Sequence, residues 1–192
     1  MKWFTETDIS VADDPELLEL LALSNCAQIL IGFESAVPDS LTGIDAHDWK
    51  RRQFDKYLQK IELIQSHGIS VNGCFILGLD SDDISVFETT KQYVLDSSLS
   101  EVQITVLTPF PGTDLYRQLQ RSGRLLKDKY WDQCTLFDVT YKPAKMSASD
   151  LECGFRSLMT DIYTDAAVKL RKSKFKECRR ERKKMIQQRR PM

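Results

Sequence analysis

The sequence predicts an α/β fold: a partial (β/α) barrel of about four parallel strands, followed by a mainly helical C-terminal extension. Apolar runs and amphipathic stretches alternate through the first 120 or so residues, a pattern typical of βα units in a parallel sheet. Three of the apolar runs end in small or polar motifs, at the position where ligands bind in such folds. Because a closed eight-stranded barrel needs ~250 residues, a chain of 192 residues indicates an incomplete barrel.

The first half of the predicted sheet comes from residues 2–6 and 27–32, two apolar runs with β-strand character. Between them, Pro15 suits the first turn of a helix, because its missing N–H is not needed there. Residues 38–48 are polar and predict a loop. A long helix is then expected from about residue 48 to residue 66, where apolar side chains recur at helical spacing. The buried side of the first helix is expected to consist of Leu17, Leu18 and Leu21.

The second half continues the alternation with strands at 69–77 and 102–107 and a helix at 84–95 between them. In the last strand apolar residues alternate with Gln103 and Thr105, so one face of it is expected to be polar. A short helix follows, capped by Thr113 and stopped by Gly123.

The character of the chain changes after residue 125. An aromatic-rich irregular segment leads to a capping-box pattern at 149–152 and then to a long amphipathic helix. Its apolar face is predicted to contain Leu151, Phe155, Leu158, Met159, Ile162, Ala166 and Leu170. We therefore divide the chain into a partial barrel (1–125), an accessory region with the long helix (126–170) and a basic tail (171–192).

The net charge of −1 conceals a strong asymmetry. Residues 169–192 carry twelve Lys or Arg against Glu177 and Glu181, a net charge of +10, so the preceding 168 residues carry −11. A basic end of this kind can contact nucleic acid, an anionic membrane or the acidic body itself. A solvated, partly frayed helix end is the favoured interpretation.

Several classes of protein are disfavoured by what the sequence contains. No run of ~18 apolar residues predicts a membrane span, and the N-terminus shows no signal-peptide core, so we expect a cytoplasmic protein. The five cysteines lack the close spacing of a zinc or iron–sulfur site, which predicts free thiols and no metal ligands in this chain. His47 and His67 have no paired nucleophile, so no catalytic residue is assigned.

The three strand-end motifs are the candidate binding residues. A carboxylate at Glu34, beside Ser35, can accept hydrogen bonds from a ribose diol, although a salt bridge or a helix cap explains it equally well. Glycines at Gly73 and Gly78 permit close approach of a ligand to the backbone. The prolines of the 108–113 loop stiffen it, which also suits a connector without a ligand. The acids at 80–83 are better explained by the dipole of the following helix than by a metal.

Taken together, these motifs resemble the C-terminal half of a radical S-adenosylmethionine (SAM) catalytic domain, and most closely its cobalamin-binding class. The resemblance covers residues 1–125, and 126–170 resembles the accessory region of that class. Its order and spacing fit strands three to six of the family's partial (β/α)6 barrel. The motifs that carry it are WFTETDI (3–9), PELL (15–18), IGFES (31–35), GCFILGLD (73–80), TPFPGTDLY (108–116) and GRL (123–125).

The resemblance implies a SAM site in this chain. Glu34 and Ser35 would contact the ribose, and the strand at 69–77 would flank the adenine. The residues implied for the adenine pocket are Phe75, Ile76, Gly78, Leu107, Thr108 and Pro109. Cys74 stands where the family pattern has glycine.

The family's CxxxCxxC cluster motif does not occur in these 192 residues. By the resemblance, the intact enzyme would cleave SAM reductively at a [4Fe–4S] cluster and use cobalamin for methylation or related radical chemistry. This chain alone is expected to be inactive. Its implied partner is the missing N-terminal half or a second chain that completes the barrel, and open sheet edges favour self-association. The alternative is a non-catalytic half-barrel scaffold whose basic tail binds a partner.

Overall fold

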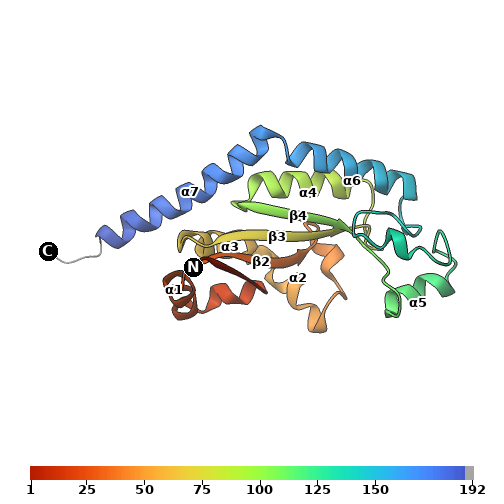
Figure 1. Ribbon diagram of the computed structural model, residues 1–192, viewed down its shortest axis with the longest axis horizontal. Helices are drawn as coiled ribbons and strands as arrows, with labels where there is room; N and C mark the ends of the chain where they lie inside the picture. Colours follow the sequence, from red (N-terminus) through yellow and green to blue (C-terminus); the bar gives the residue numbers. More distant parts are fainter. Residues whose placement is uncertain (189–192) are drawn as a thin grey trace.

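The computed structural model describes residues 1–188, and these fold around one parallel sheet (Figure 1). Its strands are β1 (Trp3–Thr7), β2 (Cys26–Glu34), β3 (Ser70–Leu77) and β4 (Glu101–Val106), and they are hydrogen-bonded in the order β1-β2-β3-β4. The sequence order equals the spatial order, as in one arc of a (β/α) barrel. The predicted fold class is confirmed.

Helices connect the strands and extend beyond them. The α-helices are α1 (Pro15–Leu23), α2 (Trp49–Gln53), α3 (Tyr57–Ser66), α4 (Ser85–Asp96), α5 (Asp114–Arg121), α6 (Ala148–Ile162) and α7 (Asp165–Gln188). The short 3-10 helices are η1 (Ile9–Asp13), η2 (Pro38–Leu41), η3 (Ala46–Asp48), η4 (Phe54–Lys56) and η5 (Trp131–Gln133).

Local sequence signals account for the helix ends of the barrel part. The carboxylate of Asp14 accepts the Leu17 N–H at 2.9 Å at the start of α1, and Thr113 caps α5 in the same way through the Tyr116 N–H. Asn25 and Gly123 follow their helices with φ values of 65° each, the left-handed conformation that stops a helix.

Four details differ from the sequence prediction. The single helix expected at 48–66 is broken into short pieces that end in α3. The capping box forms between Ser147 and Asp150, two residues earlier than expected, because the Ser147 hydroxyl is the one that meets the N3 N–H. The predicted long helix is broken after Ile162. Beyond the break Ala167 is buried, whereas Ala166 and Leu170, which were predicted for the apolar face, are exposed. Leu17 is also wrongly predicted, since it is 40% exposed.

One face of the sheet forms the core. Side chains at alternate positions of the central strands are buried there under α3 and α4. The Phe33 and Phe75 rings stack at 5.7 Å and meet Tyr57 and Tyr93 from the helix layer. The intervening residues of β2 and β3 face the opposite side and are half-buried. In a closed barrel that side would line the interior.

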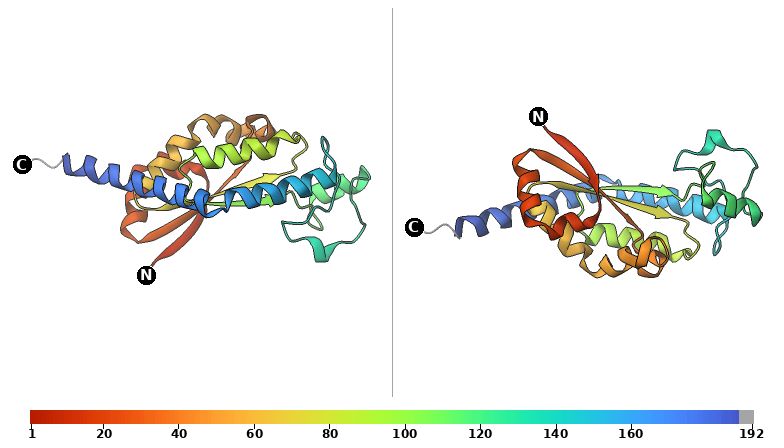
Figure 2. Two further views of the ribbon diagram at one scale, coloured as in Figure 1. Left: turned by 90° about the horizontal axis from the view of Figure 1, so that it is seen from above. Right: turned by 90° about the horizontal axis from the view of Figure 1, so that it is seen from below.

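The last two helices form an outer layer, in which α6 packs on α4 and α7 packs on α3 and α4 (Figures 1 and 2). The two views of Figure 2 show α7 passing over the sheet and extending beyond its amino end. Among residues 1–188, no helix has the length and hydrophobicity needed to cross a membrane.

Candidate functional site

The carboxyl ends of β2, β3 and β4 lie at one edge of the sheet, because all three strands are parallel neighbours. The three motifs identified in the sequence follow these ends and therefore converge. On the half-buried face below them, Gly32, Cys74 and Gln103 are register partners in one row across the strands. This edge and the half-buried face beside it constitute the candidate site.

Glu34 is the most unusual residue of the site. It ends β2 with φ at 66°, a left-handed conformation that is uncommon for residues with a side chain. A bulge precedes it. Gly32 pairs with Cys74, and the next pair along the strands is Glu34 with Phe75, so β2 has one extra residue at this point. Bulges of this kind re-aim a side chain and are frequent beside active sites.

The Glu34 carboxylate is held by Lys50 from α2. The Lys50 ammonium lies 2.5 Å from Glu34 Oε1 and also donates to the Gly32 carbonyl at 2.7 Å. Both side chains remain about one-fifth exposed. Glu34 therefore forms a salt bridge, one of the interpretations that the sequence left open. Its second carboxylate oxygen has no protein partner among the described residues.

Ser35, the neighbouring candidate, is turned into the protein. It is 2% exposed, and its hydroxyl oxygen accepts the Val37 N–H at 3.0 Å. It thus fixes the turn after Glu34, and its hydroxyl hydrogen and second lone pair remain available to another group.

The loop after β3 is built around Gly78, whose φ is +90°. Its N–H and that of Leu79 both donate to the Asp82 carboxylate at 3.0 Å. The Tyr141 hydroxyl donates to the Gly78 carbonyl from the other side. A side chain at Gly78 would collide with Tyr141 and with Leu151, so glycine is required for the close approach.

Asp82 is a buried acid without a basic partner among the described residues. It is 2% exposed and also accepts the Ser40 hydroxyl at 2.8 Å. Burial raises its pKa above the ordinary value, and the hydrogen bonds from Ser40, Leu79 and Gly78 act in the opposite direction. Asp82 therefore ties the β2 and β3 loops together, whereas its neighbour Asp83 serves the start of α4 by accepting the Ser85 N–H.

The remaining candidate residues divide between the two faces. Phe75 is buried in the core, so only its backbone lies at the site, whereas Ile76 is half-buried on the opposite face. Leu107 continues β4 by donating its N–H to the Leu77 carbonyl. Thr108 and Pro109 are buried, and the Pro109 carbonyl accepts the Tyr130 hydroxyl at 3.2 Å.

Cys74 presents its thiol on the half-buried face. Burial, together with the nearby carboxylates of Glu34 and Glu6, raises its pKa to about 11. The thiol is thus protonated at neutral pH. Two residues earlier on β3, the side-chain oxygen of Asn72 is buried without a hydrogen-bonding partner in the described chain, which leaves an acceptor on the same face.

Sequence reasoning did not identify Lys50, Asp82 as a loop brace, or Tyr141. Lys50 and Tyr141 are far from the motifs along the chain, and only the fold brings them to Glu34 and Gly78. Asp82 carried a local signal, an acid four residues after a strand-ending glycine, but helix-dipole reasoning explained it equally well.

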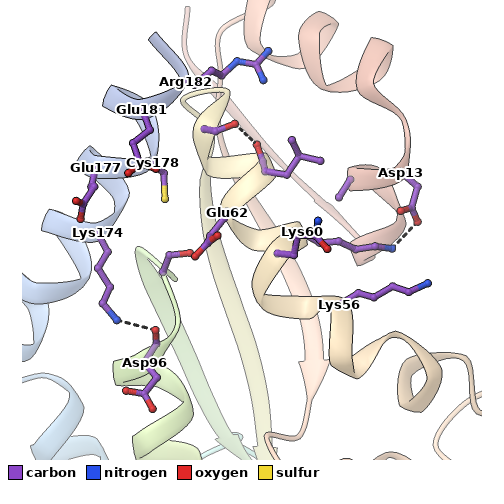
Figure 3. Close-up of a pocket in the computed structure, with 15 residues that line it drawn as sticks. Asp13, Lys56, Lys60, Glu62, Asp96, Lys174, Glu177, Cys178, Glu181 and Arg182 are labelled. Atoms are coloured by element: carbon purple, nitrogen blue, oxygen red, sulfur yellow. Dashed lines mark hydrogen bonds and ion pairs between the residues drawn. The ribbon is translucent and has the colours of Figure 1, made fainter. Parts of the chain in front are cut away.

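A groove of about 690 Å³ lies elsewhere, between α3 and α7 (Figure 3). Two of its cations are engaged: Lys60 is paired with Asp13 at 2.6 Å, and Lys174 donates to backbone carbonyls at the end of α4. Within residues 1–188, no three His, Cys, Asp or Glu side chains are placed to hold a metal. The groove is remote from the strand-end motifs and shares no lining residue with them.

Comparisons with known proteins match this chain to several enzymes. Residues 113–192 match a family described as a domain of unknown function, DUF4070. The chain is 26% identical to a bacteriochlorophyllide d C-12(1)-methyltransferase of Chlorobaculum tepidum over 168 residues, 88% of this chain and 36% of that protein. It is 32% identical to a hopanoid C-2 methylase of Rhodopseudomonas palustris over 64% of this chain and 23% of that protein.

A solved structure shares the fold. The archaeal Elp3 of Methanocaldococcus infernus superposes with a TM-score of 0.53 at 14% identity, over 74% of this chain and 29% of that one. Together with the converging strand-end motifs, these matches support the resemblance to a C-terminal part of a radical SAM enzyme.

The chain spans only between 23% and 36% of the length of the two curated relatives named above. Both of these are methyl-transferring enzymes by name, and an anaerobic magnesium-protoporphyrin IX monomethyl ester cyclase of Rubrivivax gelatinosus also matches, at 24% identity over 61% of this chain and 20% of that protein. The matched region corresponds to one part of a longer enzyme in each case.

Proposed function

We propose that this chain supplies the SAM adenosine-binding half of a radical SAM barrel, within an enzyme that transfers methyl groups with the help of cobalamin. The observation that carries the proposal is Glu34. A left-handed Glu at a strand bulge costs about 1–3 kcal/mol and is maintained by its surroundings, as strained residues at functional sites are. Here Lys50 maintains it and leaves one carboxylate oxygen for a ligand.

The residues around Glu34 fit an adenosine. The free carboxylate oxygen suits a ribose diol, since an ionised carboxylate accepts two hydrogen bonds readily. Ile76 offers an apolar surface for the base, and the rigid end of β4 from Leu107 to Pro109 forms the opposite wall. Phe75 contributes through its backbone, and Gly78 through the conformation that it gives to the loop beside the base. Ser35 holds the turn that presents Glu34.

The iron–sulfur cluster does not fit the residues present here. The described residues contain no metal-ligating group of three side chains, and the sequence contains no CxxxCxxC motif. In the intact enzyme the [4Fe–4S] cluster and cobalamin would be held by residues outside these 192 and would supply reductive SAM cleavage and methyl transfer. The part played by this chain is to bind and orient the nucleoside.

The two edges of the sheet indicate where the rest of the barrel attaches. At the β4 edge, the Val106 N–H donates to the Leu136 carbonyl at 2.7 Å, and Tyr163 donates its hydroxyl to the Val102 carbonyl. The β1 edge is exposed, with Phe4 68% accessible. We therefore place the missing N-terminal half, or a second chain, at β1, where an uncovered edge can pair.

The test uses 5′-methylthioadenosine, a nucleoside that contacts the adenosine pocket without requiring the cluster. Equilibrium dialysis of this chain should show binding that Glu34→Gln weakens roughly tenfold, because a neutral amide replaces a charge-assisted hydrogen bond. Glu62→Gln, an exposed position on α3, is the matched control. Equal affinity of the Glu34 variant and the parent, with circular dichroism unchanged, would remove Glu34 from the site.

A non-catalytic scaffold is the second candidate, and the basic outer face of α7 favours it. A half-barrel that binds no adenine nucleoside, while α7 binds a partner, would support this alternative.

A further inference from the structure

Helix α7 has an inner face that is packed on the body. Residues on this face engage neighbouring elements: Arg171 donates to the Ile162 carbonyl at 2.6 Å, Lys174 to the Leu95 and Asp96 carbonyls, and Arg182 to Glu19. Cys178 lies between them against the groove of Figure 3. The expected solvated and frayed end is therefore solvated on one side only.

Another face of α7, beside the inner face and turned partly outward, is a continuous basic stripe. At about 100° per residue, its members fall within an arc of roughly 100°. All of them are exposed, and between Lys169 and Lys183 no acidic or apolar side chain falls in the same arc, although Asp165 in the first turn of the helix does. The basic stripe consists of Lys169, Lys172, Lys176, Arg179, Arg180 and Lys183.

These six cations have no internal role in the described chain. None of them forms a hydrogen bond or an ion pair with any residue from 1 to 184, although Arg179 lies over the Phe175 ring at 5.7 Å. The stripe from Lys169 to Lys183 is about 21 Å long, from the helical rise. Between Lys169 and Lys183 no acid on this face offsets the charge repulsion, so the stripe is complementary to an extended anionic surface.

A hollow adjoins the stripe at the amino end of the sheet. It has a volume of about 570 Å³ and lies between α7 and the starts of β1 to β4. Lys2, Lys172, Lys176 and Arg179 line it, against a single carboxylate, Glu101. The hollow is thus a concave cationic site next to the basic stripe of α7. Its volume is large enough to receive a phosphate-bearing head group.

We propose that the basic stripe of α7 docks this protein on the surface of an anionic membrane, with a lipid phosphate in the adjoining hollow. Polybasic clusters of this size bind anionic lipids through head-group electrostatics. The absence of apolar side chains from the stripe specifies surface contact without insertion. Base readout of a nucleic acid in the major groove is a poorer fit, because α7 is packed on the body up to Arg182, and binding through phosphates alone is an outcome that the experiment below distinguishes.

The experiment is co-sedimentation of the chain with sucrose-loaded vesicles of two compositions. One is pure phosphatidylcholine, and the other contains about 30% phosphatidylglycerol, which gives a surface charge near the physiological level. We expect binding to the anionic vesicles only, with a strong decrease at high salt. Each cation strengthens such binding about fivefold, so Lys172→Gln with Lys176→Gln and Arg180→Gln should weaken it roughly a hundredfold. Glutamine is chosen because it keeps helix propensity.

The matched control removes the same number of charges from loops near the strand-end site, with Lys129→Gln, Lys142→Gln and Lys145→Gln. It has the same net charge as the α7 variant and should bind anionic vesicles much more tightly than that variant. Circular dichroism establishes that all variants are folded. Three results would overturn the proposal: binding to neutral vesicles as tight as to anionic ones, no greater loss in the α7 variant than in the control, or tighter binding to a fluorescein-labelled 20-mer oligonucleotide than to anionic vesicles at the same salt. Adenosine binding is measured separately and does not enter this outcome.

Discussion

Replacing Asp82 by alanine tests how the strand-end site is held together. The Asp82 carboxylate accepts the Gly78 and Leu79 N–H groups at 3.0 Å each and the Ser40 hydroxyl at 2.8 Å, in a position that is 2% exposed. Its removal leaves three donors without this acceptor. Each unsatisfied buried donor costs about 1–3 kcal/mol, and the relief of the buried charge offsets part of the sum. We expect a net loss of about 3 kcal/mol.

The assay is urea unfolding of the chain followed by far-ultraviolet circular dichroism, with the free energy of unfolding from linear extrapolation. Asp132→Ala is the control, because Asp132 is exposed and accepts no hydrogen bond from the described residues. The reasoning is refuted if Asp82→Ala unfolds at the same urea concentration as Asp132→Ala. A loss of 5′-methylthioadenosine binding by Asp82→Ala at low temperature, where the variant is folded, would show that the loop brace also positions the site.

Further predictions concern the same region. Burial raises the pKa of Asp82 in the folded chain, so the contribution of Asp82 to stability falls as pH rises from the unfolded pKa through the folded pKa. Asp82→Asn cannot titrate, and we therefore expect its loss of unfolding free energy relative to the parent to be larger at the acid end of this pH window than above it. Urea titrations at several pH values measure the difference. Gly78→Ala places a methyl group at φ +90°, 2.8 Å from Leu151 and against Tyr141, and should lower the free energy of unfolding by about 3 kcal/mol; a change below about 1 kcal/mol would mean that the loop moves aside. Because the pKa of Cys74 is raised to about 11 while Cys153 is exposed, iodoacetamide at pH 7.5 should label Cys153 first, as followed by peptide mass spectrometry; equal labelling would show that the half-buried face is open to solvent and its thiol ionised.

The order and type of the elements could be predicted from sequence because the signals are local. The local signals are the apolar run of β3, the alternation of apolar and polar residues in β4, Pro15 and Asp14 at the start of α1, and the left-handed stops at Asn25 and Gly123. Each depends on residues within a few positions of each other. The convergence of the strand-end motifs also followed, since parallel neighbouring strands bring their carboxyl ends together. The identity of Glu34 as a site candidate came from its place in that pattern, and its ligand contact remains a prediction.

The partners of those residues were decided by tertiary structure alone. Lys50 reaches Glu34 across 16 residues and Tyr141 reaches Gly78 across 63, and no local pattern encodes such distances. The same holds for α7: its composition indicated a basic helix, but whether a given cation contacts the body or faces outward depends on the bend after Ile162. Side-chain chemistry and spacing specify which elements form, while the relative placement of elements follows from packing that involves the whole chain.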